Sequence, residues 1–389
     1  MRHQASVLEQ VVQHFPWSRL DHYVRKHGAD DNQRGFTSRK HLLALLAGSL
    51  GGHHSLRSLV AALGPNGGAM RLLGGTAPAR STLADAMRDR PAELFGDLLH
   101  ELIGHVANRA TRCSLKAAVR LIDATHLDLG LRMRRWLGLH RGQAAAKLHL
   151  VYDPRAEQPV FFEITPARIN DITAAKHMLP IEAGAIYVFD LGYYDFAWWA
   201  RLAANACIFV TRLKSNTPLR ATEQRAVIAG GTVLSDRVGY LPERLAASRR
   251  NPFNQPGREI TVRTDNGKVL RLFTNDLISP AEQIAALYKE RWQIELFFKW
   301  IKQNLKISKF IGTSENAIRL QIAVAFIAYL LVRLMQAAQS QPYPAVMVLL
   351  IVRSHLFVRR HIAELLDPRQ TAPPNHTAAS SQLRLPLCN

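Results

Sequence analysis

Four polar side chains fall on one face of a predicted helix over residues 287–306. They are Tyr288, Arg291, Glu295 and Lys302, in the spacing Y-x2-R-x3-E-x6-K. Because an α-helix turns by about 100° per residue, they lie within an arc of about 60°. Most other residues of the segment are apolar, which predicts a helix buried on most sides. A buried charge is unfavourable without a partner, so this stripe requires polar groups on a neighbouring element.

Two aspartates at the ends of apolar runs are the predicted partners. Asp123 ends the run AVRLID and Asp190 ends AIYVFD, and both runs predict strands. Groups at strand ends of an open α/β sheet converge on one crevice. Each aspartate taken alone is more often a helix cap or a turn residue. With Glu295 from the helix they predict a three-carboxylate site.

Three carboxylates are typical of a site for hard divalent cations. Mg²⁺ and Mn²⁺ prefer carboxylate oxygens and retain several waters. Two such ions about 3.5–4 Å apart activate a water or a 3′-hydroxyl and stabilise the leaving oxygen of a phosphodiester. Arg291 and Lys302 are then suited to phosphate oxygens. An ion pair between Arg291 and Glu295, four residues apart, is compatible with this role. For Tyr288 and Lys302 the alternative is core packing or a solvated face.

The charge balance indicates a polyanionic partner. Fifty Lys and Arg residues face thirty Asp and Glu in 389 residues, a formal excess of +20. Nucleic acid is the commonest partner of so basic a chain. From Lys299 to Arg360 the only acidic residue is Glu315, which indicates a DNA-backbone or partner surface or, alternatively, a basic solvated face.

Cysteine usage and hydropathy bear on the compartment. Cys113, Cys207 and Cys388 form neither a disulfide framework nor a metal cluster with known spacing, which fits a reducing cytoplasm. The segment MRHQASVLEQVVQHF lacks the apolar core of a signal peptide. The longest apolar run, Leu320–Val332, is too short to span a bilayer. We therefore expect a cytoplasmic protein with no membrane partner.

Helix and strand signals predict three parts and an α/β fold class. Residues 1–110 combine helical periodicity with Gly and Pro breaks, which predicts an all-helical domain. Residues 111–335 alternate strands with helices, which predicts a mixed α/β sheet. Within them, residues 217–276 form a β-rich insertion with an Asp-Asn-Gly hairpin turn. Residues 336–389 predict a helical segment and a disordered tail from Asp367 onward.

The N-terminal helices allow two interpretations. They form either a helix-turn-helix DNA reader or a small bundle that only packs. Arg80, Arg88 and Arg90 are candidates for DNA contact in the first case. Trp292 and Trp300 could stack on a base, although a Trp on an apolar helix is usually core. Five histidines lack metal-ligand spacing and are interpreted as phosphate or structural contacts: His53, His54, His126, His140 and His149.

The candidate site resembles that of a known family. Asp123 in LIDATHLDL, Asp190 in YVFDLGYYD and Glu295 within the Y-R-E-K spacing are similar to the DDE triad and YREK signature of bacterial insertion-sequence transposases of family four. The segment 217–276 resembles that family's insertion into its RNase H-like fold. The run GFTSRKHLLALLAGSLGGHHSLRSL, with ARSTLADAMRDRP after it, resembles the helical domain that begins one branch of the family. The likeness covers most of the chain up to about Leu366, and the YREK spacing is its specific part.

This resemblance implies an activity and a role for each matched residue. Asp123, Asp190 and Glu295 would hold Mg²⁺ or Mn²⁺, two ions in all, in an RNase H-like catalytic core. Tyr288, Arg291 and Lys302 would contact DNA beside the scissile bond. The activity would be metal-dependent cut-and-paste transposition, with strand cleavage at the element ends, 3′-hydroxyl strand transfer and hairpin intermediates.

The partners implied are double-stranded DNA, as the terminal inverted repeats and the target, and a second copy of the chain in the synaptic complex. The compartment would be the bacterial cytoplasm, at the nucleoid. Two rival functions remain open: a structure-specific nuclease on the same fold, and an inactive or domesticated transposase that only binds DNA.

Overall fold

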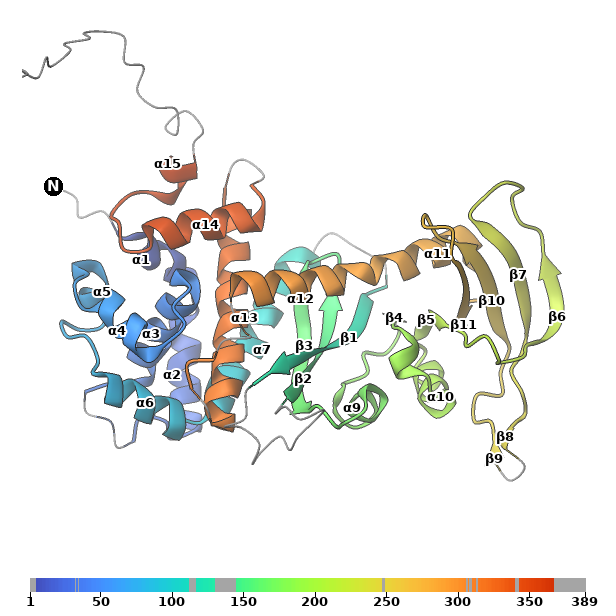
Figure 1. Ribbon diagram of the computed structural model, residues 1–389, viewed down its shortest axis with the longest axis horizontal. Helices are drawn as coiled ribbons and strands as arrows, with labels where there is room; N and C mark the ends of the chain where they lie inside the picture. The colour runs from blue at the N-terminus through green and yellow to red at the C-terminus, as the bar shows by residue number, and fades with distance from the viewer. Residues whose placement is uncertain are drawn as a thin grey trace, which may run out of the picture.

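The computed structural model describes residues 5–31, 33, 35–111, 117–129, 145–246, 249–305, 307, 310–312, 314–339 and 343–366. The molecule is elongated, with helices from both ends of the sequence gathered on one side and a large sheet extending to the other (Figure 1). Three predicted features lie outside the described residues: the tail from Asp367 onward, the residue His140, and Lys306 at the end of the predicted helix.

Nine strands form one mixed sheet in the order β3-β2-β1-β4-β5-β11-β10-β7-β6. Their bounds are β1 Val119–Asp128, β2 Ala145–Asp153, β3 Gln158–Pro166, β4 Ile186–Val188, β5 Ile208–Arg212, β6 Arg220–Arg225, β7 Val233–Tyr240, β10 Gly257–Arg263 and β11 Val269–Thr274. A separate pair comprises β8 Arg244–Ala246 and β9 Arg249–Arg250. The predicted mixed α/β sheet is thus confirmed.

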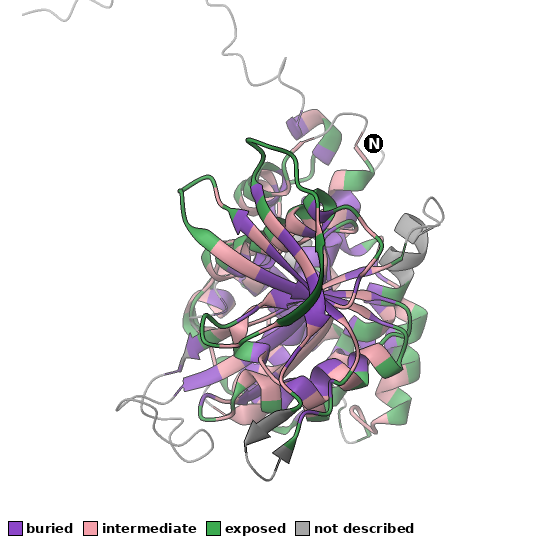
Figure 2. Ribbon diagram, turned by 90° about the vertical axis from the view of Figure 1, so that its right-hand side faces the viewer, coloured by how far each residue is buried: buried purple, intermediate pink, exposed green. Residues whose placement is uncertain are grey.

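The strand directions divide this sheet into two halves. β1 is antiparallel to β2 and parallel to β4, and β4 is parallel to β5. Beyond β5 every pairing is antiparallel, starting with Leu272 of β11 opposite Arg212 of β5. The strands of segment 217–276 therefore extend the same sheet. The outermost of them, β6, is exposed along nearly its whole length (Figure 2).

The strand predicted to end at Asp123 continues to Asp128, so that prediction was wrong. The cause is β2, whose pairing with β1 runs without a break from Tyr152 opposite Leu121 to Ala145 opposite Asp128. Asp123 therefore lies in mid-strand, opposite Leu150. The pairing with β2 therefore fixes the backbone that carries this side chain.

The helices form two groups. Those of the N-terminal part are α1 Val7–Val12, α2 Trp17–Lys26, α3 Ser38–Gly51, α4 Leu56–Leu63, α5 Gly67–Leu72, α6 Arg80–Asp89 and α7 Ala92–Thr111. Those of the remaining chain are α9 Asp171–Met178, α10 Phe196–Ala204, α11 Ala281–Glu290, α12 Trp292–Asn304, α13 Glu315–Ala337, α14 Ala345–His355 and α15 Ile362–Leu366, with a 3₁₀ turn, η2, at Leu191–Tyr193.

Helix α13 is the centre of the helical side. Ser314 caps it by accepting a hydrogen bond from the Ala317 N–H (3.1 Å), and its apolar residues pack against α3, α6, α7 and α14. The two ends of the sequence also meet there, because the Leu8 N–H donates to the Leu356 carbonyl (2.8 Å). One apolar core thus runs from the N-terminal helices through α13 to β1 and β2.

The apolar run Leu320–Val332 was predicted to be too short to span a bilayer, and this prediction needs correction. The run lies inside α13, whose 23 residues are long and apolar enough to cross a membrane by length and composition, and α13 is the only such helix in the described part of the chain. Most of its apolar window, 83%, is buried inside the protein. Burial of this kind is the pattern of a core helix.

Candidate active site

Arg291 links two of the predicted carboxylates. Its Nη2 atom lies 2.5 Å from Oε1 of Glu295, and its Nη1 atom lies 3.6 Å from Oδ2 of Asp123. Helix α12 packs on β1, which brings a helix residue and a strand residue to the same guanidinium. All three side chains are largely shielded from solvent, with 17%, 32% and 18% of Arg291, Glu295 and Asp123 exposed. Asp123 and Glu295, which are 172 residues apart in the sequence, are therefore brought together around one cation.

The predicted single helix is divided at Arg291. Helices α11 and α12 lie nearly in line, and Arg291 keeps helical backbone angles (φ −51°, ψ −30°) (Figure 1). Its N–H donates to the Tyr288 carbonyl, and the Ile294 N–H donates to the Arg291 carbonyl, each at 3.2 Å. Both bonds close a three-residue span, so the chain is locally tightened like a 3₁₀ turn. Despite this break, Arg291 and Lys302 both face β1, where they contact Asp123 and Thr125.

The pKa of Asp123 is raised to about 7. Burial is the main cause, because it disfavours the charged form. The charges of Asp190 and Glu295 raise it further, whereas the Ala124 N–H, which donates to Asp123 Oδ1 (2.8 Å), and Arg291 lower it. Asp190 and Glu295 are thus both within electrostatic reach of Asp123.

Asp190 lies two residues beyond β4, beside β1. Leu121 of β1 pairs in parallel with Val188 of β4, so Asp190, two residues on, comes level with Asp123, two residues beyond Leu121. Its Oδ1 accepts a hydrogen bond from the Gly192 N–H (2.8 Å) and so caps η2. The turn-forming interpretation of this aspartate is confirmed, and it is compatible with the prediction of a site carboxylate.

Tyr288 and Lys302 occupy the two ends of the stripe. The guanidinium carbon of Arg291 lies 5.9 Å from the centre of the Tyr288 ring, and burial raises the pKa of Tyr288. The Lys302 ammonium donates to the Thr125 hydroxyl (2.6 Å) and to the His126 carbonyl (2.8 Å). Lys302 therefore contacts β1 just beyond Asp123, a partner that the sequence did not indicate.

A cleft opens beside these residues. It has a volume of about 480 Å³, and its lining includes Asp123, Glu295, Lys299 and Lys302. Helix α12 thus presents one carboxylate and two ammonium groups to the cleft, and β1 presents the carboxylate of Asp123. This distribution suits an anionic polymer whose reacting phosphate sits at the carboxylates.

The donor set fits hard divalent cations in kind. Carboxylate oxygens are the ligands such ions prefer. The hydroxyl of Tyr193, which is within electrostatic reach of Asp123 and Asp190, is also fully buried and has no hydrogen-bond partner among the described residues. In the described ranges no three His, Cys, Asp or Glu side chains are gathered as closely as a bound ion requires. Arg291 instead supplies the positive charge next to Asp123 and Glu295.

Two neighbouring residues, Asp171 and Lys147, were missed in the sequence, and a third, His149, was named there only as a phosphate or structural contact. Asp171, at the start of α9, lies 3.0 Å from the Lys147 ammonium, and its Oδ2 would lie 3.2 Å from a Cβ placed on Gly192. His149 is buried and bonds the Thr165 hydroxyl (2.9 Å). Lys147 and His149 alternate along β2 and so share a face. That alternation of polar residues in an apolar strand was the available signal.

Several weaker candidates lie elsewhere. Arg90 is buried and donates to the carbonyls of Phe36 and Thr37, so it is structural and the idea of a DNA contact was wrong.

Trp300 packs on Tyr329, with ring centres 5.0 Å apart. Trp292 is 57% exposed and Leu296 49% exposed. The expectation of a helix buried on most sides therefore fails at these two residues, because no described element covers that face of α12.

Comparison with known proteins identifies the family. The model of the Transposase DDE domain matches residues 115–331, and that of a domain of unknown function, DUF4372, matches residues 3–74. "Putative transposase y4zB" of Sinorhizobium fredii is 39% identical over 300 residues, 76% of this chain and 82% of that protein. "Probable transposase for insertion sequence element IS5377" of Geobacillus stearothermophilus is 30% identical over 262 residues, 65% of this chain and 66% of that protein.

Among solved structures, that of the piggyBac transposase synaptic complex with hairpin DNA is similar. Its TM-score is 0.49 at 11% identity, and the match covers 98% of this chain and 88% of that one. The Transposase DDE domain model spans more than half of the 389 residues, and the y4zB relative aligns over most of its own length. The chain therefore belongs to the DDE transposase family and is a DNA transposase.

Proposed function

We propose that Asp123, Asp190 and Glu295 are the catalytic carboxylates of this transposase. The main support is the guanidinium of Arg291, which lies within reach of both Asp123 and Glu295. The parallel register that brings Asp190 level with Asp123 is further support, and the charge of Asp190 is among those that raise the pKa of Asp123. The order β3-β2-β1-β4-β5, with an antiparallel meander followed by two parallel strands, supports an RNase H-like core around them.

DDE transposase domains generally use divalent metal ions, and we propose Mg²⁺ or Mn²⁺, as two ions, for this site. Such ions would activate the attacking oxygen and stabilise the leaving oxygen of the phosphodiester. The three carboxylates would hold them, and Arg291 would leave Asp123 and Glu295 when it turns to a phosphate. Burial of Asp123 keeps this exchange out of bulk water.

DNA would contact the stripe and the N-terminal helices. Tyr288, Arg291 and Lys302 would hold phosphates beside the scissile bond, where charge-assisted hydrogen bonds are strong. Residues 1–110 would bind the terminal inverted repeats, residues 111–335 would carry out the chemistry, and residues 336–389 would form a C-terminal helical segment and tail. Two copies would bring two ends together in the cytoplasm, at the nucleoid, for cut-and-paste transposition through hairpin ends and insertion into target DNA.

Cleavage of a labelled duplex carrying the element's own end, with Mg²⁺, tests this proposal. Wild type should cut at the terminal nucleotide, Glu295→Gln should not, and Glu282→Gln, an exposed acid on α11, should cut as wild type does. Equal cleavage by wild type and Glu295→Gln would contradict the carboxylate assignment. Binding without cleavage by all three proteins would favour a DNA-binding relic, and preferential cutting of branched DNA would favour a nuclease.

A further inference from the structure

A second cleft lies between two helices of the N-terminal part. It has a volume of about 500 Å³, and its walls come from the start of α4, the start of α6 and Ile311, in the segment after α12. The polar side chains that line it are His54, Ser55, Arg57, Arg80 and Ser81. The described lining holds no acidic residue.

The two arginines of this cleft differ from the others nearby. Arg57 and Arg80 are exposed, and neither forms an ion pair or a side-chain hydrogen bond within the described ranges. Arg88, on the same helix as Arg80, is held by Asp85 (3.0 Å) and Asp89 (2.7 Å). Two guanidiniums that share one cleft without a counter-charge repel each other, so an anion that pairs with both is favoured there.

Backbone donors add to this charge. Ala79 precedes α6 and provides no side-chain cap, so the first N–H groups of α6 are left for another acceptor. Ser55 caps α4 and accepts from the Ser58 N–H (3.0 Å). The two arginines require a negatively charged ligand, and the first N–H groups of α6 suit its oxygen atoms.

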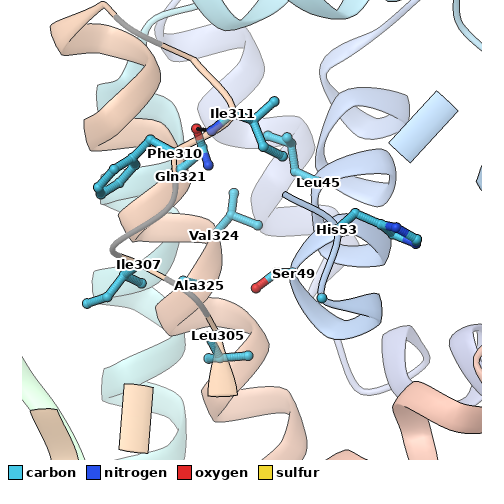
Figure 3. Close-up of a pocket in the computed structure, with 12 residues that line it drawn as sticks. Leu45, Ser49, His53, Leu305, Ile307, Phe310, Ile311, Gln321, Val324 and Ala325 are labelled. Carbon is cyan, nitrogen blue, oxygen red and sulfur yellow. Dashed lines mark hydrogen bonds between the residues drawn. The ribbon is translucent and has the colours of Figure 1, made fainter. Parts of the chain in front are cut away.

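One short segment connects this cleft with the catalytic one. Lys302 lines the catalytic cleft and Ile311 lines the second. The Ile311 N–H donates to Oε1 of Gln321 on α13 (2.9 Å), which fixes that part of the segment beside α3 (Figure 3). Lysines recur along it at 299, 302, 306 and 309 without an acid among residues 299–311.

We propose that the cleft of Arg57 and Arg80 binds backbone phosphates of the same DNA end that enters the catalytic cleft. The two clefts are connected by the nine residues that lead from Lys302 to Ile311, and a chain of nine residues spans at most about 30 Å. Successive phosphates of one strand rise by about 3.4 Å along the duplex. The bound phosphates therefore lie within about nine base pairs of the cleaved bond. This inference rests on the proposed function and specifies where the N-terminal helices hold the end.

Salt-dependent binding of the full-length protein tests it. The probes are a 40-base-pair duplex of the element's end and a random duplex of the same length, with Arg57→Ala, Arg80→Ala and the control Arg88→Ala. Each cleft variant should weaken binding about eightfold at 0.1 M salt and reduce the slope of log K against log salt by about 1, on both duplexes. Arg88→Ala should retain the wild-type slope, because its charge is already paired.

Methylphosphonate linkages in the end duplex locate the contact. Neutral linkages within about nine base pairs of the cleaved bond should weaken wild type but not Arg57→Ala combined with Arg80→Ala. Wild-type slopes in both cleft variants, or sensitivity only at more distant linkages, would overturn the inference. If the inference fails in this way but the wild-type protein still cleaves the end, the proposed function stands. If the wild-type protein does not cleave the end but the cleft variants show the expected reduced salt slopes and Arg88→Ala the wild-type slope, only the proposed function is contradicted.

Discussion

The ammonium of Lys302 lies 2.6 Å from the hydroxyl of Thr125. Lys302 is on α12, the helix of Glu295, and Thr125 is on β1, two residues after Asp123. The bond therefore ties the two elements that carry the candidate carboxylates. It also gives the last residue of the stripe a role in assembling the site before any DNA is bound.

Thr125→Val should loosen this tie. The substitution removes the hydroxyl but keeps the shape, and Lys302 retains the His126 carbonyl, so the free energy of unfolding should fall by about 1 kcal/mol. Urea denaturation measures this change. Thr222→Val, which removes a longer hydroxyl bond to Val238 (3.3 Å) on the sheet's outer strands, is the matched control and should lose less. Equal losses in the two variants would show that the Lys302 bond has no special weight.

Removing Arg291 should make the fold more dependent on divalent cations. In Arg291→Met the partly buried carboxylates Asp123 and Glu295 lose their shared cation, so the metal-free protein should be less stable at pH 8. Mg²⁺ binds the same oxygens and should raise the melting temperature more in this variant than in wild type.

Differential scanning fluorimetry with and without Mg²⁺ measures that difference. Arg333→Met, which loses a more exposed partner, Glu157, is the control and should show the wild-type Mg²⁺ effect. An equal Mg²⁺ effect in wild type and Arg291→Met would mean that Arg291 and the ions do not share these carboxylates.

The pKa of Asp123 predicts a pH dependence of stability in the absence of metal. Its folded value, about 7, lies above the ordinary value of 3.8, so the folded state binds a proton that the unfolded state has released between these pH values. The free energy of unfolding should therefore fall as pH rises from about 4 to about 7 through this group. Asp123→Asn should lose that part of the slope, measured by urea denaturation in EDTA. A wild-type slope in the variant would assign the pH dependence to other groups.

The sequence predicted more of the site than of its surroundings. Residue types and helical spacing placed Arg291 beside Glu295, and apolar runs placed Asp123 and Asp190 at strand ends expected to converge on one crevice. Spacing could not show that β1 runs on to Asp128, because its length depends on pairing with β2. Nor could it show the 3₁₀-like break at Arg291, the Lys302 contact with Thr125, or the exposure of Trp292, which all depend on what packs against α12.

Gly192 lies between two carboxylates, and its lack of a side chain should matter for cleavage. A Cβ at this position would lie 3.0 Å from Oδ1 of Asp190 and 3.2 Å from Oδ2 of Asp171. Gly192→Ala should therefore push Asp190 away from its hydrogen bond with the Gly192 N–H. Contacts of this length require the carboxylates to shift by a few tenths of an ångström. Because displacement of a reacting group by about 1 Å can reduce a rate about 100-fold, a shift of that size should reduce the rate roughly fivefold.

Cleavage of the end duplex should accordingly fall roughly fivefold in Gly192→Ala, while the melting temperature stays within about 4 °C of wild type, the effect of about 1 kcal/mol. Gly96→Ala on α7 is the matched control, because a Cβ there meets no atom within 4 Å. It should cleave as wild type does. Full activity in Gly192→Ala would mean that Asp190 tolerates this displacement and would weaken its assignment to the reacting centre.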